Sequence, residues 1–492
     1  MDKRILAVLF LTVLFFQRPV ESWAFKLLDN KLDVRGSLQQ TMNILIHEEV
    51  RDIRYSSFRT MARLDALFES IRTQELSVKY YLLANYYFDE VLAIDSDLRS
   101  AIRNEAGKNK FKYYRRPRNS DEWLTELYAD VIYKNFQVRL GKQIVSWGDV
   151  ADAQVADVIN PLDNKYRLAF PDWEDYKLGL WMVRMFYTPP NWWQDLSFEL
   201  IVIPFDFEET RFPPAPGLIG LPVFPNFTAQ KMMDAQRSDA PKDGHQCFEI
   251  GMRIRGYSSI FEGIDWTISH FYSRLDTPLV DGDRGASNIV KMMFGGRSRD
   301  GKTYTYPYYN STALTASTTW DAIGAAVRTE CAYNTNRDYQ YGTSSVSGGI
   351  KEKDLITATL KFSFSGIMVP YYSDRMFGNK NRAMSFSLTF SQYWMKNHEY
   401  NKHTGEYIMG ETKKDPRLSK VAWAAMWFFN NDEWIVNYFG SYDSNSRGSH
   451  ITGLMYKPDD HWTFSASYMK MAEAGISRYM DQVVLNVRYE FY

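Results

Sequence analysis

The chain has 492 residues, a formal net charge of −1, two cysteines and an aromatic content of 16%, including 33 Tyr and 14 Trp. This balance of charge gives no attraction to a polyanion, so nucleic acid is not expected as a partner. The aromatic content suits the two interfacial girdles of a membrane β-barrel, although a carbohydrate-binding β protein can be equally rich in aromatic residues.

The N-terminus has the three parts of a secretory signal peptide. Residues 1–4 are basic, residues 5–16 form an apolar run, and Ser22-Trp23-Ala24 places small residues where a signal peptidase cleaves. The apolar run is too short to span a bilayer comfortably as a helix. We therefore expect residues 1–24 to be removed and a single mature domain to cover residues 25–492.

Strand-like alternation dominates the mature chain, and it contains no apolar stretch long enough for a transmembrane helix. Apolar and polar residues alternate with a period of two, which indicates β-strands. The clearest examples cover residues 57–68, 248–255, 264–269, 356–365, 384–391 and 462–468. A soluble sandwich shows the same period with its apolar face inward, so the period alone does not separate a sandwich from a barrel.

The most distinctive local sequence is R-L-G-K-Q-I-V-S-W-G-D over residues 139–149, followed by D-V-I-N-P-L-D-N over residues 157–164. The first part predicts a strand with polar residues on its inner face, ending at a glycine that can turn the chain sharply. The second part predicts a loop, because Asn-Pro initiates turns and Asp can bond its own backbone. The constriction candidates in this region are Arg139, Gln143, Trp147, Asp149, Asp157, Asn160 and Asp163.

Two interpretations of the 147–175 loop stay open. It could fold into the lumen as a constriction and pair with wall arginines such as Arg253 and Arg255, which share the inner face of a predicted strand. It could equally be an ordinary surface loop held by local hydrogen bonds. Similarly, the apolar, proline-rich segment 211–227 could form a lid for apolar solutes, contact a partner or the lipopolysaccharide edge, or simply pack over the barrel mouth.

The two cysteines are expected on opposite faces of their strands. Cys247 shares phase with Glu249 and faces the lumen, whereas Cys331 shares phase with Val327 and faces lipid. This placement argues against a disulfide bridge. Arg328 and Glu330 are in phase with each other and are expected to point inward as a charge pair, either lining a pore or stiffening the wall.

Short and long connections alternate along the chain, as they do in outer-membrane barrels. Short turns are predicted at Tyr133–Asn135, Asn430–Glu433 and Lys457–His461, and long segments over residues 91–120, 147–175, 207–245, 276–302 and 397–418. The count is about 18 strands if residues 304–336 are divided at Thr319–Asp321, and 16 is the fallback. An even count places both termini at the periplasmic end.

The C-terminal strand gives the most informative pattern. Its two faces separate completely: Val483, Leu485, Val487, Tyr489 and Phe491 on one, Asn486, Arg488 and Glu490 on the other. Lipid would contact the first face and a wet lumen the second. With the signal peptide, this predicts an all-β, transmembrane antiparallel β-barrel in the outer membrane of a Gram-negative bacterium, with long external loops and one inward-folding loop.

The 139–164 region resembles a bacterial family of unknown function labelled DUF1302, whose members carry a similar G-x-Q-x-x-x-W-G-E … N-x-I-N-P-x-D run. F-E-I-G-M-R-I-R-G at 248–256 and A-V-R-T-E-C-A-Y at 326–333 are also similar. The chain departs from the pattern in having Asp149 where Glu is usual and Tyr492 after the in-phase Phe491. The resemblance implies an outer-membrane barrel linked to hydrophobic compounds or to partner transporters, with no established substrate.

No enzymatic motif stands out. The seven histidines lack zinc-ligand spacing, and neither a nucleophile elbow nor a Walker loop is present. We expect no enzyme, no cofactor and no metal, although one sequence does not exclude a triad assembled across strands.

Two functions from different classes follow. The first is a porin-like channel for small solutes, hydrophobic or amphipathic ones included, constricted by the 147–175 loop. The alternative is a non-conducting barrel that anchors a periplasmic or surface partner. A secreted, soluble β protein is a third possibility. The expected partners are outer-membrane lipid and lipopolysaccharide, a small solute and a periplasmic transport partner.

Overall fold

The computed structural model describes residues 31–47, 52–94, 96, 99–100, 116–117, 120–150, 155–163, 177–190, 195–211, 235, 237–242, 244–260, 262–293, 301–342, 347–367, 384–401, 406–408, 416–472 and 481–491. The predicted signal peptide, residues 212–227 of the proline-rich segment, and residues 151–154 and 164–175 of the predicted constriction loop lie outside these residues. No helix in the described ranges is long and apolar enough to cross a membrane.

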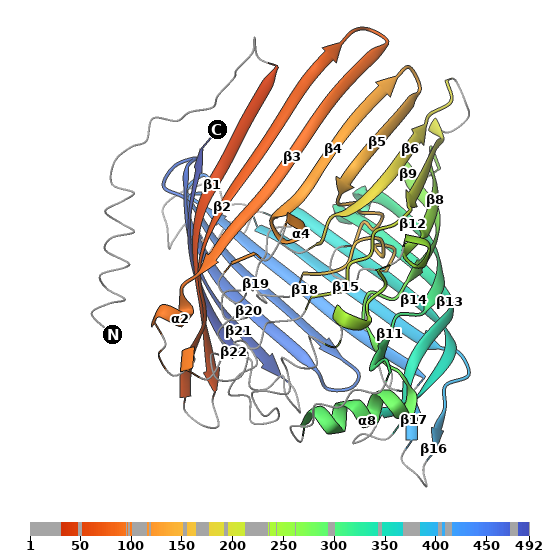
Figure 1. The fold of residues 1–492 in the computed structure, drawn as a ribbon. Coiled ribbons are helices and arrows are strands. Elements are labelled where there is room, and N and C mark those ends of the chain that lie inside the picture. The colour runs from red at the N-terminus through yellow and green to blue at the C-terminus, as the bar shows by residue number, and fades with distance from the viewer. Residues whose placement is uncertain are drawn as a thin grey trace.

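The chain forms one closed, antiparallel β-barrel of 18 strands, which confirms the predicted fold class (Figure 1). The wall consists, in chain order, of β1 (Leu32–His47), β2 (Asp52–Arg72), β3 (Leu76–Asp89), β4 (Leu124–Tyr133), β5 (Phe136–Gln143), β6 (Leu180–Tyr187), β7 (Ser197–Ile203), β8 (Glu249–Ser258), β9 (Ile264–Arg274), β12 (Tyr308–Trp320), β13 (Ala325–Gly342), β14 (Ser347–Ile367), β15 (Met384–Met395), β18 (Arg417–Phe429), β19 (Trp434–Asp443), β20 (Gly448–Tyr456), β21 (Trp462–Ala472) and β22 (Asp481–Phe491). Each strand pairs with its neighbour in this order, and β22 pairs with β1 to close the ring.

One end of the barrel carries the predicted tight turns. Lys134 takes a φ of 51° between β4 and β5, and Asn430, Asn431 and Asp432 take positive φ between β18 and β19. The division of residues 304–336 is also confirmed: β12 ends at Trp320, and a 3-10 turn, η4 (Asp321–Ile323), leads into β13. At this short-turn end β1 begins and β22 ends, as the even strand count predicts.

The opposite end carries the long connections and their small elements. These are α2 (Val91–Ile94), α4 (Ser120–Trp123), η3 (Gly244–Cys247), α8 (Gly282–Met293), the two-stranded sheet of β10 (Leu279–Val280) with β11 (Tyr304–Thr305), and the short strands β16 (Tyr400–Asn401) and β17 (Glu406–Ile408). Figure 1 shows α2, α8 and β16 together at this end. The five predicted long segments therefore all fall at this end, and the three predicted short turns fall at the other, although the connection of residues 368–383 at the short-turn end is also long.

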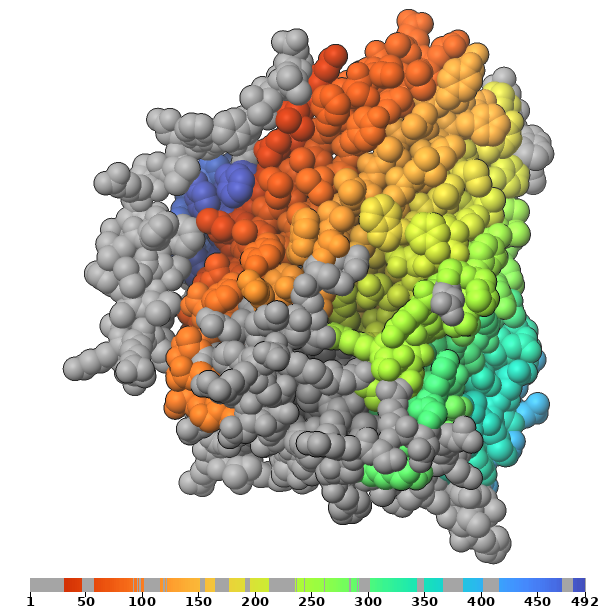
Figure 2. Space-filling view, viewed as in Figure 1, coloured from red at the N-terminus to blue at the C-terminus, as the bar shows by residue number. Residues whose placement is uncertain are grey.

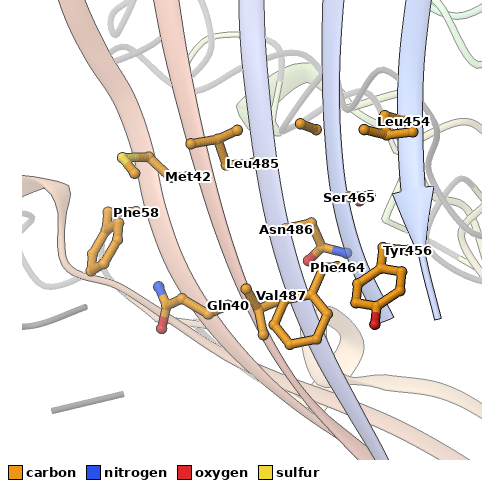
Figure 3. A pocket seen from close by; sticks show the side chains of 11 residues that line it. Gln40, Met42, Phe58, Leu454, Tyr456, Phe464, Ser465, Leu485, Asn486 and Val487 are labelled. Atoms are coloured by element: carbon orange, nitrogen blue, oxygen red, sulfur yellow. The ribbon is translucent and has the colours of Figure 1, made fainter. Parts of the chain in front are cut away.

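The outer face of the wall carries exposed apolar side chains such as Leu64, Leu140 and Ile268. Figure 2 shows the strands from β1 to β9 side by side as a continuous surface. At the closing seam, residues of β1, β2, β20, β21 and β22, most of them with outward side chains, line a groove of about 310 Å³ (Figure 3). Leu485 of β22 and Phe464 of β21 lie there, 38% and 39% exposed. Asn486, from the other face of β22, accepts a hydrogen bond from Thr41 at 3.1 Å. The two-faced pattern of the C-terminal strand is confirmed.

Aromatic pairs gather on the outer face beside the short turns. The ring centroids of Trp434 and Tyr456 are 4.2 Å apart, and those of Phe136 and Tyr187 are 4.5 Å apart. An aromatic belt at the edge of an apolar band is typical of a membrane interface.

The cysteines are both free. Cys331 is exposed and lies on β13, as the phase predicts. Cys247 is buried in η3 before β8 begins, so the prediction that it occupies the lumen face of a strand is wrong. The alternation of β8 does not extend back to it because the backbone turns there.

Candidate functional site

The connection from β5 to β6 folds inside the barrel and packs on its inner wall. Val145, Trp147 and Ile159 from this connection form a buried cluster with five wall residues: Leu180, Met182, Ile201, Ile203 and Phe271. Trp147 is 2% exposed, and its ring meets Phe271 of β9 edge-on at a centroid distance of 6.0 Å. The wall is apolar here because the loop, not water, covers it. The sequence predicts that this loop folds inward, but it does not predict the apolar wall surface against which the loop packs.

A glycine on β8 makes room for this tryptophan. A Cβ at Gly251 would lie 2.7 Å from Cη2 of Trp147 and 2.6 Å from Cδ2 of Phe271. Contacts this short would force one of the two rings to move. Gly251 is therefore required by the close approach of the loop to the wall.

Glu330 of β13 holds the far side of the loop. Its Oε1 accepts the backbone N–H groups of Asp149 and Val150 at 2.5 and 2.6 Å, and its Oε2 accepts that of Ala156 at 3.1 Å. The residue is fully buried. Hydrogen bonds to a charged group are each worth about 1.5–3 kcal/mol. The loop therefore reaches from β5 across β6, β7, β8, β9 and β12 and is fixed on β13.

Asn160 joins the two ends of the loop. Its Oδ1 accepts the N–H of Val145 at 2.7 Å, and its Nδ2 donates to the carbonyl oxygens of Gln143 and Leu178 at 3.2 and 2.8 Å. Gln143 is itself buried, and its side chain donates to the carbonyl of Met182. Asn160 and Gln143 thus act as buried structural links, because these contacts are to backbone within or beside the loop.

The loop carboxylates pair with nearby cations. Asp157 forms a buried ion pair with Lys177 at 2.5 Å, and Asp163 lies 3.4 Å from Arg211. Burial lowers the pKa of Lys177, and Asp157 opposes that shift. In the described part of the loop, Asp157 and Asp163 pair with Lys177 and Arg211 and not with Arg253 and Arg255, the wall arginines that the constriction interpretation named.

The wall arginines belong to a separate charged row on β4–β8. Arg253 of β8 and Arg184 of β6 share the carboxylate of Glu199 on β7, at 2.6 and 2.5 Å. Arg139 of β5 pairs with Asp130 of β4 at 2.9 Å. In the described part of the loop, Arg253 contacts the ring of Trp147, whose centroid lies 5.5 Å from the guanidinium carbon.

The remaining predicted residues face the lumen side of the wall or the loop surface. Arg255 and Asp149 are exposed, and Asp149 accepts a hydrogen bond from Thr315 of β12 at 3.4 Å. The expected charge pair of Arg328 with Glu330 is wrong, because the loop amides engage both oxygens of Glu330. In the register, Arg328 lies opposite Lys361 of β14.

Sequence reasoning missed Asp130, Lys177, Arg184 and Glu199. A signal was present for two of them: Arg184 and Glu199 are single charged residues inside the apolar strand sequences L-W-M-V-R-M-F-Y and S-F-E-L-I-V-I. An isolated charge in such a strand indicates an inward, paired position.

No curated protein matches the chain. Among solved structures, OccAB3 of Acinetobacter baumannii superposes with a TM-score of 0.47 at 8% identity, covering 94% of this chain and 99% of that one. OccK11 (OpdR) of Pseudomonas aeruginosa gives 0.46 at 11%, covering 94% and 96%, and Salmonella typhi OmpF in complex with daunomycin gives 0.42 at 10%, covering 94% and 97%.

A family model described as a protein of unknown function, DUF1302, matches residues 52–491, which include every strand of the barrel except β1. The matched region contains the inward loop, Glu330 and the charged row. The chain belongs to the DUF1302 family.

Proposed function

We propose that this protein is a porin-like channel of the bacterial outer membrane, narrowed by the inward connection between β5 and β6. The observation that carries the proposal is the fixed position of this connection on the inner wall, from the Trp147 cluster on β6–β9 to Glu330 on β13. A segment anchored in this way stays inside the barrel and reduces its cross-section while leaving the wall intact.

The membrane location rests on the two faces of the wall. Apolar side chains cover the outside, aromatic pairs mark one edge, and charged and hydroxyl side chains line much of the inside. Closure of the sheet satisfies the backbone hydrogen bonds, which a strand protein needs in lipid. The short-turn end, where β1 begins and β22 ends, would face the periplasm, and the long connections would face outward.

The charges around the loop give the proposed channel its selectivity. Arg255 and Asp149 are exposed and of opposite sign, and the row of arginines on β5–β8 adds positive potential to one side. Rings of charged side chains set the preference of a pore for ions. The solutes would be small, with hydrophobic or amphipathic molecules among them.

Single-channel recording tests the proposal. The refolded mature protein and a variant lacking residues 151–172 would be inserted into planar bilayers in concentrated KCl. Stable current steps that grow in the loop-deleted variant support a channel constricted by the loop. Insertion without current in either form rejects it and favours the alternative, a barrel that docks a periplasmic or surface partner.

A further inference from the structure

The inner face of each strand can be followed around the barrel from Glu330. Glu330 pairs in register with Thr359 of β14, Thr359 with Ser391 of β15, and Ser391 with Lys420 of β18. Because neighbouring partners in a sheet point to the same side, Lys420 also faces the lumen. Every second residue of β18 from Lys420 onward therefore lies on the inner wall.

This phase places an apolar surface inside the barrel. We define the apolar stripe as Met426 and Phe428 of β18, Phe439 of β19, Ile451 and Met455 of β20, and Met469 of β21. All six side chains are partly exposed. The opposite phase fits the outer face, where Trp423 packs beside His450 and Tyr438 bonds His450 at 2.8 Å.

The stripe differs from the adjoining wall. The inward residues of β12, β14 and β15 include Thr315, Thr357, Thr359, Thr389 and Ser391, which suit a wet lumen. Apolar surface in water costs about 25 cal/mol per Å². Hydroxyl side chains occupy the wall beside the stripe, so the partly exposed apolar side chains of the stripe offer a distinct contact surface to an apolar part of a solute.

The charged row lies across the barrel from the stripe. Between β8 and β18 lie β9, β12, β13, β14 and β15, and between β21 and β5 lie β22, β1, β2, β3 and β4 (Figure 1). The row has four guanidinium groups, those of Arg139, Arg184, Arg253 and Arg255, against the carboxylates of Asp130 and Glu199. It is therefore net positive. Arg139, Arg184 and Arg253 are engaged by Asp130 and Glu199, and the exposed Arg255 is the guanidinium that faces the lumen for a carboxylate.

We infer that the channel selects amphipathic anions, with a hydrocarbon chain against the stripe and a carboxylate toward the arginine row. This inference rests on the proposed channel function and names its substrate class. A purely apolar solute would leave the arginine row unused, and a small hydrophilic anion would leave the stripe unused. A fatty-acid-like monocarboxylate of medium chain length would hold its chain on the stripe and its carboxylate in the lumen, on the side where the row makes the potential positive.

The test is block of ionic current by a series of carboxylates, from acetate to octanoate, with octyltrimethylammonium as a cation of matched chain length. Transfer of each CH₂ from water is worth about 0.8 kcal/mol when fully buried, so blocking potency is expected to rise by up to roughly fourfold per CH₂. Octyltrimethylammonium is expected to block less than octanoate.

Two variants assign the effect to its surfaces. Phe439→Ser is expected to reduce octanoate potency at least severalfold and leave acetate unchanged, with Thr389→Ser on the polar wall as the matched control. Arg255→Gln is expected to reduce the preference for octanoate over octyltrimethylammonium. Correct folding of each variant is checked by its resistance to unfolding in cold detergent.

The outcomes separate the two claims. A conducting channel in which acetate and octanoate block equally overturns the substrate class and leaves the channel standing. Unchanged octanoate block in a folded Phe439→Ser protein also overturns it. The absence of any current rejects the channel itself, and the inference falls with it.

Discussion

Glu330 accepts the backbone N–H of Val150 at 2.6 Å, although the two residues are 180 positions apart in the chain. This bond and those from Asp149 and Ala156 to the same carboxylate fix the loop to β13. A flexible segment with few polar contacts would leave the lumen or move within it. The Glu330 carboxylate therefore holds the loop in a fixed position on the inner wall.

Removal of this carboxylate is expected to release the far side of the loop. Glu330→Ala loses three hydrogen bonds, and loss of even two weakens docking by roughly 3 kcal/mol, about a hundredfold in the docked population. Bilayer recordings should show larger or noisier unit currents, with a smaller effect for Glu330→Gln, which keeps one acceptor oxygen. The exposed Glu352→Gln on β14 is the matched control. Currents of wild-type size and noise in Glu330→Ala would contradict the anchoring role.

Gly251 and Trp147 are expected to be energetically coupled. Gly251→Ala forces the indole or Phe271 to move. Trp147→Ala leaves a cavity and lowers the free energy of unfolding by about 3–5 kcal/mol. In the double variant the added methyl group meets no indole. The loss of stability in the double variant should therefore be smaller than the sum of the losses in the two single variants. Urea unfolding in detergent measures the cycle. Gly349→Ala, whose Cβ would meet nothing nearer than 3.5 Å, is the control; additive effects would show that the close approach is absent.

The stability of the long-loop end is expected to depend on pH through Asp276, between β9 and β10. Burial raises the pKa of Asp276 to about 8, although the positive charges of Arg337 and Lys177 oppose this shift. The folded protein thus binds this proton more tightly than the unfolded chain, whose carboxyl has a pKa near 3.8. The stabilisation is full below pH 4 and is lost as pH rises to about 8.

Asp276→Asn removes this titration, so its unfolding temperature should change less than that of wild type between pH 4 and pH 8. Thermal unfolding followed by tryptophan fluorescence measures both curves. Asp281→Asn, on the same connection, controls for loss of a carboxylate. Parallel curves for wild type and Asp276→Asn would rule out the burial of this group.

The sequence predicted the barrel well because strand phase and turn chemistry are local. The alternation at the C-terminus, the turn at Lys134 and the break after Trp320 each depend on a few adjacent residues. The inward loop was also within reach, since its Trp-Gly and Asn-Pro elements mark a sharp, ordered path.

The partners of the loop could not be read from the sequence. Glu330 and its three amides are joined only when β5 and β13 take their places in the ring, and the in-phase Arg328 looked like the nearer partner. The apolar stripe could not be predicted from the sequence for a different reason. In β18 the residues from Val421 to Phe429 are all apolar, so both faces look alike, and only the register with β15 and β19 separates them.

The most direct test of a loop-lined aqueous path is block by a thiol reagent at position 149. Asp149→Cys would be made in a protein with Cys247→Ser and Cys331→Ser, and treated with a sulfonatoethyl methanethiosulfonate during recording. The outward Cys331, kept in an otherwise cysteine-free protein, is the control. A lasting fall in unit current in the Asp149→Cys protein but not in the control is the predicted result; complete labelling of the introduced thiol without any change in current would contradict the account.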